Sequence, residues 1–310
     1  MTLRPHFDDF KAAYNNGRAQ VAVASFVSDL ETPVSAMLKL AQGKHGQTYS
    51  FILESVEGGA IRGRYSFIGL RPDLIWRCFG DKAEINRDAV AGLDAFRPCP
   101  VAEKSGARAS LRSLIDESRI ELPDGLPPMA AGLVGYMAYD MVRLAENLPT
   151  PNPDPLGLPD GIFVRPTLIT VFDSVTDTMS VITPVRPTEG TSARDAYAAA
   201  GARIAEVAEG LRQAPPIEES SAANEMPEPA SNMSRDGFRR MVLKAKDYIL
   251  AGDIFQVVLS QRFAMPFKLP AFSLYRALRR LNPSPFLFFL DFGDFSVVGS
   301  SPEILVRVRG

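Results

Sequence analysis

The chain has 310 residues, of which 46% are hydrophobic and 23% are charged. This is an ordinary globular composition with enough apolar material for a core, and it excludes a wholly disordered chain. The 34 basic residues nearly balance the 36 acidic ones, which argues against a broad basic surface for nucleic acid. Two cysteines and two histidines argue against a disulfide framework and a dedicated zinc site, although carboxylates could still hold a hard ion such as Mg²⁺.

The N-terminal residues 1–14 carry charges where a signal peptide needs an apolar run. No stretch approaches the about 18 consecutive apolar residues that a membrane-spanning helix needs. We therefore expect a cytoplasmic protein that has neither membrane nor nucleic-acid partners.

The first two thirds of the chain alternate between strand and helix patterns. We expect strands at residues 20–26, 48–53, 65–68 and 133–136, and a hairpin of strands 167–172 and 179–182. Helices are expected at 33–41, 110–120 and 193–211. The first of them has Thr32 as an N-cap followed by a proline, which is a favourable helix start.

Residues 213–232 are rich in Pro, Glu, Ser and Ala and almost lack large apolar side chains. Such a segment cannot bury enough surface to order itself, so we interpret it as a linker. It predicts an N-terminal domain at 1–212, a linker at 213–233 and a second domain at 234–310.

The second domain begins with a helix pattern whose N-cap is Ser234 and whose stop is Gly252. Its apolar face comprises Phe238, Met241, Val242, Ala245, Tyr248 and Ile249. A strand at 254–263, a helix at 272–281 and strands at 285–290, 295–298 and 304–308 are expected to follow. The layout predicts a β-rich α+β fold. Because the last strand pattern stops two residues before Gly310, we expect this second domain to be incomplete.

Three polar features could carry chemistry. Glu54 and Ser55 follow an apolar strand, where they form either a ligand site or a simple turn. Residues 282–286 (NPSPF) contain two prolines and form either a rigid loop or an apolar wall. Gln256 lies mid-strand on a face shared with Ile254 and Val258, where its amide needs partners, so it is either structural or a site residue.

Six segments together resemble component I, the large subunit, of the anthranilate synthases, a family of chorismate-utilising enzymes. Similarity to the family's N-terminal domain lies in FILES (51–55), GRYSFIG (63–69) and GLVGYMAYDMVR (132–143). Similarity to the opening of its chorismate-binding domain lies in GDIFQVVLSQR (252–262), NPSPFLFFL (282–290) and VVGSSPEILVRV (297–308). The six occur in the family's order, and they imply that family's layered, β-rich sandwich.

The resemblance implies a carbon–oxygen lyase of tryptophan biosynthesis. Chorismate gains an amino group from ammonia, loses its enolic hydroxyl and eliminates pyruvate to give anthranilate. A glutamine amidotransferase subunit supplies the ammonia, and Mg²⁺ bridges carboxylates of substrate and protein. The family's catalytic and metal carboxylates lie beyond residue 310, so no metal ligand is expected in this chain and we expect the chain alone to be inactive.

The resemblance also implies roles for individual residues. In water-adding relatives a lysine stands at the position of Gln256, whereas ammonia, already a nucleophile, needs no such base. Feedback inhibition by L-tryptophan would place the effector's polar end at Glu54 and Ser55. Its indole would lie against Pro285, Phe286 and Leu287 of the second domain. Arg64 would be a basic residue near this site.

Two alternatives remain open at this stage. The first is component I of an aminodeoxychorismate synthase, which also uses ammonia and therefore shares the glutamine at position 256. The second is a non-catalytic regulatory module that binds tryptophan and ends at Gly310.

Overall fold

The computed structural model describes the whole chain except residues 1, 42–46, 58–60, 150, 217–226 and 309–310. Two compact units are present. The first comprises Met1–Ile217 with Ala271–Gly310, and the second comprises Glu218–Pro270. Among the described residues, no helix has the length and apolar character needed to cross a bilayer.

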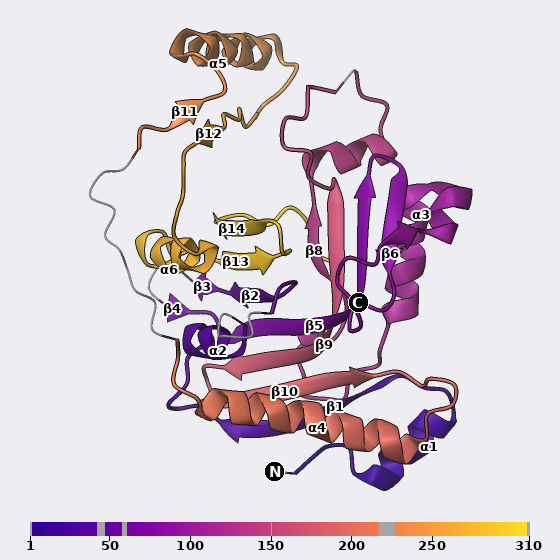
Figure 1. The fold of residues 1–310 in the computed structure, drawn as a ribbon. Coiled ribbons are helices and arrows are strands. Elements are labelled where there is room, and N and C mark those ends of the chain that lie inside the picture. The colour runs from indigo at the N-terminus through magenta and orange to yellow at the C-terminus, as the bar shows by residue number, and fades with distance from the viewer. Residues whose placement is uncertain (1, 42–46, 58–60, 150, 217–226, 309–310) are drawn as a thin grey trace. The chain divides into compact units, whose positions relative to one another are not determined.

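The first unit combines helices with a large sheet (Figure 1). Its helices are α1 (Phe7–Asn15), α2 (Pro33–Leu40), α3 (Pro100–Ser118), α4 (Ala193–Arg212) and α6 (Ala271–Leu281), with 3₁₀ turns at Pro128–Ala130 and Tyr139–Leu144. Its sheet strands are β1 (Gln20–Val27), β2 (Phe51–Glu54), β5 (Tyr65–Phe79), β6 (Lys82–Asn86), β7 (Arg97–Pro98), β8 (Val134–Met137), β9 (Gly161–Asp173), β10 (Thr178–Val185), β13 (Phe286–Asp291) and β14 (Ser296–Ser301). A separate short ribbon pairs β3 (Val56–Glu57) with β4 (Ile61–Arg62).

Ten strands of the described chain form one antiparallel sheet whose main order is β1-β10-β9-β5-β2-β13-β14. The expected hairpin is β9–β10, with Ile169 opposite Ile182. The expected α+β class is thereby confirmed. Helix α4 lies along β10 and β1 in Figure 1, so it covers one face of the sheet at the β1 edge.

Strand β5 is much longer than the expected strand at 65–68. Its pairing with β9 shifts register between Pro72 and Leu74, and Arg71 has a positive φ of 52° at this point. A proline inside an apolar run reads in sequence as an interruption, but here it occupies a β-bulge that bends the strand without ending it. The two halves of β5 therefore pair with different partners, β2 before the bulge and β6 after it.

The expected helix starts and apolar faces of the first unit are largely confirmed. Thr32 caps α2 by accepting from the Ser35 amide at 3.1 Å, and Ser35 Oγ accepts from the Thr32 amide at 2.8 Å. Helix α3 begins ten residues earlier than expected because it continues through a kink at Gly106, where φ is 80°. The main core then packs the apolar faces of α2, α4 and α6 against the sheet; its large members include Met37, Ile52, Ile68, Ile204 and Phe272.

The second unit contains α5 (Arg235–Ala251) and a short pair of strands, β11 (Ala230–Ser231) with β12 (Phe263–Ala264). Ser234 caps α5 and Gly252 ends it in the left-handed region, both as expected. No described residue of α5 is buried, so its expected apolar face is uncovered in this structure.

Two expected strands are wrong. Residues 254–263 are irregular apart from Phe263, and residues 304–308 form no described strand. A strand requires a neighbour that accepts its N–H groups and donates to its carbonyls. These segments have strand-like residue patterns but no such ladder in the described chain, and Val258 and Leu305 are 83% and 100% exposed.

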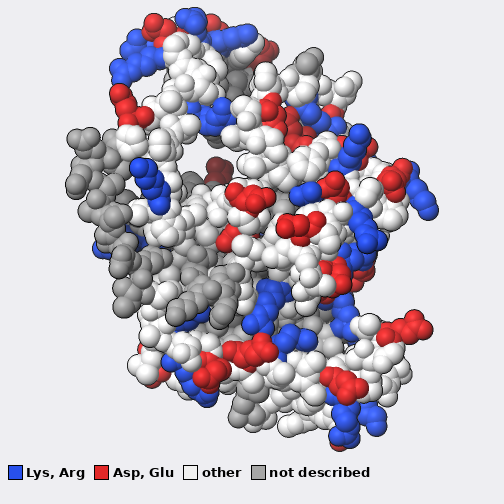
Figure 2. Space-filling view, in the orientation of Figure 1, with Lys and Arg blue, Asp and Glu red and all other residues white. Residues whose placement is uncertain are grey.

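The compact units do not follow the predicted domain boundaries. Residues 271–310 belong to the first unit because β13 pairs with β2, whereas α5 belongs to the second. Residues 217–226 of the predicted linker lie outside the described residues. Charges of both signs are interspersed over the face drawn in Figure 2, in keeping with the balanced composition.

Gly135 allows the closest backbone approach in the sheet edge formed by β8 and β9. A Cβ at this position would lie 1.9 Å from the Ile162 carbonyl oxygen, which belongs to a paired strand and cannot rotate away. We expect Gly135→Ala to lower the free energy of unfolding by about 3 kcal/mol in urea titrations. Gly92→Ala is the matched control, because nothing lies within 4 Å of its Cβ position. Equal stability of the two variants would contradict the described β8–β9 pairing.

Candidate functional site

Strands β2 and β13 bring together two of the polar features singled out in the sequence. They pair in antiparallel register, with Glu54 opposite Leu287 and Leu53 opposite Phe288. Residues directly opposite each other project from the same face of a sheet. Glu54 and Leu287 therefore share the face on which α6 packs.

The Glu54 carboxylate is enclosed by α6. Tyr275 donates its hydroxyl to Glu54 Oε2 at 2.6 Å. Arg279, one helical turn further along α6, donates through Nε to Oε2 and through Nη2 to Oε1, both at 2.8 Å. The side chains of Glu54 and Arg279 are only 5% and 18% exposed. A buried carboxylate is thus matched by a two-pronged guanidinium and a phenol.

The Glu54 carboxylate contributes to raised pKa values of both Tyr275 and Arg279. Burial, reinforced by the charge and hydrogen bond of Glu54, raises the pKa of Tyr275, which keeps the phenol protonated as a donor. Burial alone would lower the pKa of Arg279, but hydrogen bonding to Glu54 and its negative charge outweigh that effect and raise it. Both groups therefore remain donors to Glu54.

A small cleft of about 130 Å³ opens beside this cluster. It lies where the end of β2, the start of β5, the end of β9, the N-terminus of α2 and the helix α6 meet. Its polar lining includes Glu31, Thr32, Glu54, Ser55, Ser66, Asp173, Asp177 and Arg279. Three of the four carboxylates in this lining already have a basic partner: Glu54 with Arg279, Glu31 with Lys39 and Asp173 with Arg64. The excess negative charge is therefore small, and it favours a ligand that carries a cation.

The structure places Ser55 in the cleft and Arg64 behind its wall. Ser55 is half-buried and packs closely against Gly63, whose Cβ position lies 2.5 Å from the Ser55 Cβ. Arg64 is not a lining residue; its Nε and Nη2 donate to Asp173 at 3.1 and 2.8 Å. Hydrogen bonding to Arg64 is the main reason that the pKa of Asp173 is lowered.

The three predicted wall residues lie next to the cleft lining rather than in it. Leu287 is 2% exposed and belongs to the main core with Tyr275 and Phe289. Pro285 and Phe286 are half-buried. Contact between these residues and a ligand stays a prediction.

Gln256 lies in the second unit, in the irregular segment after α5, and its side chain is exposed. The expected alternating strand face with Ile254 and Val258 is therefore wrong, for want of a partner strand. Among the described residues there is no group of three or more His, Cys, Asp or Glu side chains that could hold a metal ion. We accordingly assign no step of any reaction to Mg²⁺ in this structure.

Sequence reasoning missed Tyr275, Arg279 and Asp173. The first two are four residues apart on a helix that the sequence does predict, so they lie on one face of it. A carboxylate at the end of an apolar strand also indicates a basic partner. Nothing in the spacing, however, identifies which of the 34 basic residues that partner is.

The Glu54–Arg279 pair should be a strong determinant of stability. We expect Glu54→Gln to lower the free energy of unfolding by about 3–5 kcal/mol, because it leaves the Arg279 charge buried without a counter-ion. Glu84→Gln is the matched control: Glu84 also pairs with an arginine, Arg77, but is 40% exposed, so we expect a loss below about 1 kcal/mol. Urea titrations of both variants check this, and equal losses would contradict the described burial of Glu54.

Comparison with known proteins places these features in a family. A family model described as chorismate binding enzyme matches residues 72–310. Anthranilate synthase component 1 of Cereibacter sphaeroides is 51% identical over 304 residues, which cover 98% of this chain and 59% of that protein. The Pseudomonas aeruginosa protein of the same name is 40% identical over 293 residues, 91% of this chain and 56% of the relative.

Among solved structures, anthranilate synthase component I from Streptococcus pneumoniae TIGR4 matches with a TM-score of 0.66 and 28% identity, over 91% of this chain and 58% of that one. The chain thus spans less than three fifths of the length of each of these relatives. The family model covers more than half of the chain, so this protein belongs to the chorismate-binding enzyme family.

Proposed function

We propose that this protein acts as component I of an anthranilate synthase, a lyase that converts chorismate and ammonia to anthranilate and pyruvate. The observation that carries the proposal is 51% identity, over 98% of the chain, to a relative of that name. The structure adds that four of the six motifs behind the resemblance lie on neighbouring strands, in the order β5-β2-β13-β14. Component I of an aminodeoxychorismate synthase and a purely regulatory module are not favoured by these relatives.

The proposed reaction uses ammonia as its nucleophile, and ammonia needs no base to activate it. Gln256 suits this chemistry, because a carboxamide does not take up a proton at neutral pH, and ammonia attacks without that help. The proposal includes Mg²⁺ for the substrate carboxylate and a glutamine amidotransferase subunit as the source of ammonia. It also includes the cytoplasm as the place of action. These three elements rest on the resemblance to component I.

The cleft beside Glu54 is our candidate for an L-tryptophan feedback site. Glu54 Oε1 accepts one hydrogen bond from Arg279 and, as a carboxylate oxygen, has a second lone pair for the ammonium group of an amino acid. Ser55 lines the same cleft and can donate or accept. The negative charge of the lining supports an ammonium ligand, and Arg64 would act through Asp173.

The indole would lie against residues at the start of β13. Pro285, Phe286 and Leu287 follow the cleft along β13, and Leu287 lies directly opposite Glu54. Seating an indole on them requires a side-chain movement near the start of β13, because Leu287 is packed in the core. Phe286 offers an aromatic face without a hydroxyl, so the contact would be apolar and edge-on or stacked.

Ser55→Arg tests the tryptophan site. A long cationic side chain would fill the 130 Å³ cleft and repel the ammonium group, so we expect tryptophan binding to be lost while the fold remains intact. Isothermal titration calorimetry with L-tryptophan measures binding, D-tryptophan tests the stereochemical fit, and circular dichroism checks the fold. Ser25→Arg, outside the cleft lining, is the matched control. Unchanged affinity in the Ser55 variant would sink the assignment.

Turnover by this chain can be measured directly. By the resemblance, the catalytic and metal carboxylates belong after residue 310, so we expect no anthranilate from chorismate, ammonia and Mg²⁺ above the rate without protein. Anthranilate fluorescence measures the product directly. Formation of anthranilate would show that the residues present here suffice, and formation of aminodeoxychorismate would favour the sister enzyme.

A further inference from the structure

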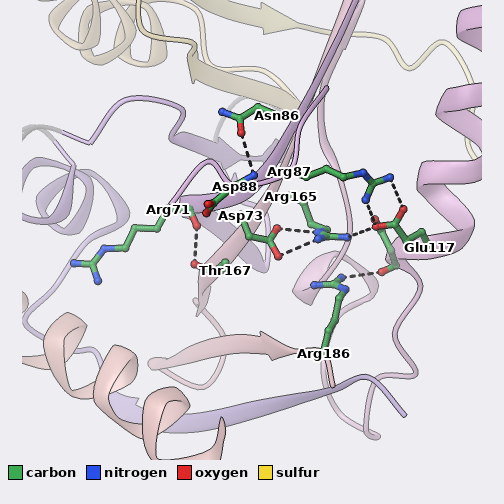
Figure 3. Close-up of polar contacts among 10 residues, drawn as sticks. Arg71, Asp73, Asn86, Arg87, Asp88, Glu117, Arg165, Thr167 and Arg186 are labelled. Carbon is green, nitrogen blue, oxygen red and sulfur yellow. Dashed lines mark hydrogen bonds and ion pairs between the residues drawn. The ribbon is translucent and has the colours of Figure 1, made fainter. Parts of the chain in front are cut away.

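A second polar cluster, apart from the Glu54 cleft, lies where β9 passes the end of α3 (Figure 3). Arg165 of β9 is 8% exposed and donates to both carboxylate oxygens of Asp73, at 2.8 and 3.0 Å. Its Nη1 also donates to Glu117 at 3.2 Å. Glu117 accepts two further hydrogen bonds from Arg87, at 2.8 and 2.9 Å. These two carboxylates and two guanidinium groups compensate one another.

Arg186 adds a third positive charge that this cluster does not balance. It follows β10, and its Nη2 donates to the Ser118 backbone carbonyl at 3.1 Å. Its Nε is buried and has no hydrogen-bond partner within the described chain. Burial, followed by repulsion from Arg165, lowers the pKa of Arg186 to about 10, so the group is still charged at neutral pH. The cluster therefore has an excess positive charge next to Ser118.

Ser118 also lines a cavity of about 560 Å³ between the end of α3 and the segment that leads into β8. This volume is within the range of about 300–1,000 Å³ that is typical of small-molecule sites. The walls are largely apolar and include Ile115, Ile120, Leu133 and Phe163. Phe163 and Arg165 are two residues apart on β9 and so share a face, which makes the cavity and the charge cluster neighbours.

The charged side chains of the cavity lining are Arg119 and Glu121, and Ser118 adds a hydroxyl. Ser118 is 3% exposed, and its Oγ has no hydrogen-bond partner in the described structure. A buried hydroxyl without a partner costs about 1–3 kcal/mol, which a ligand atom that reached it would recover. Arg119 lies at the rim, where it pairs with Asp116 at 3.3 Å in an exposed ion pair that is easily exchanged.

We propose that this cavity binds a small molecule that has an apolar body and a carboxylate. The apolar body would lie on Ile115, Leu133 and Phe163, and the carboxylate would accept a hydrogen bond from Ser118 Oγ. Glu121 and Arg119 offset each other in the lining, whereas Arg186, which donates to the Ser118 carbonyl, adds a positive charge that favours an anion at this serine. The site shares no lining residue with the Glu54 cleft, so it is independent of the proposed tryptophan site.

The fluorescence emission of Trp76 can report binding of a ligand in this cavity. This residue is the only tryptophan of the chain, it is fully buried, and its ring centroid lies 6.1 Å from that of Phe163, which lines the cavity. Benzoate is the probe, and benzamide, with the same ring and no charge, is its neutral counterpart. We expect a saturable change in Trp76 emission with benzoate and at least about tenfold weaker binding of benzamide.

A matched pair of variants separates charge from shape. Ile115 is 46% exposed, so both Gln and Glu should be tolerated there. We expect Ile115→Glu to weaken benzoate binding at least about tenfold relative to Ile115→Gln, because only the former places a negative charge beside the carboxylate. Ser118→Ala removes the hydroxyl but keeps the carbonyl that Arg186 uses, so it should weaken binding several-fold without loss of thermal stability.

Three results would overturn the proposal. The first is the absence of any saturable emission change up to about 10 mM benzoate, a concentration above the millimolar affinity expected of a weak fragment. The second is equal binding of benzoate and benzamide. The third is equal benzoate affinity in the Glu and Gln variants of Ile115, which would show that no carboxylate approaches this wall.

Discussion

The pairing of β2 with β13 is the contact on which the rest of the first unit depends. It joins residues 51–54 to residues 287–290, and the hydrogen bond from Tyr275 to Glu54 behind it spans 221 positions of sequence. Closing so long a loop carries an entropic cost, which burial of Leu287 and Phe289 in the main core offsets. Without this ladder, the β13–β14 hairpin would not join the sheet, and α6 would lose part of the surface on which it packs. The cleft beside Glu54 would then lose the wall that α6 provides.

The two buried charge clusters differ in a way that separates stability from binding. At Glu54, a carboxylate meets a guanidinium and a phenol through three hydrogen bonds of 2.6, 2.8 and 2.8 Å. At Arg186, one guanidinium nitrogen and the neighbouring Ser118 hydroxyl have no partner within the described chain. Fully matched groups fix a structure, whereas unmatched buried groups are expected where something else binds.

The cleft beside Glu54 forms where strands β2 and β9 end. Polar side chains follow the apolar runs of β2 and β9, Thr32 caps α2, and Ser66 comes from β5, so these elements bring hydroxyls and carboxylates together beside Arg279 of α6. In the same arrangement, the Glu54 carboxylate is oriented by Arg279 of α6 in the absence of any ligand. Preorganised groups of this kind bind with less loss of conformational entropy.

Local sequence patterns predicted the fold class, the helices at 193–211 and 272–281 and the β9–β10 hairpin, and they singled out Glu54 and Ser55 as candidate site residues. Each of these depends on local periodicity, capping or a polar residue at the end of an apolar run. Only the tertiary structure decided that Glu54 pairs with Arg279, that Pro72 occupies a bulge inside one long strand, and that residues 254–263 form no strand. Partner choice depends on which distant segments meet. One-dimensional patterns describe the face that a segment offers, but not the neighbour that covers it.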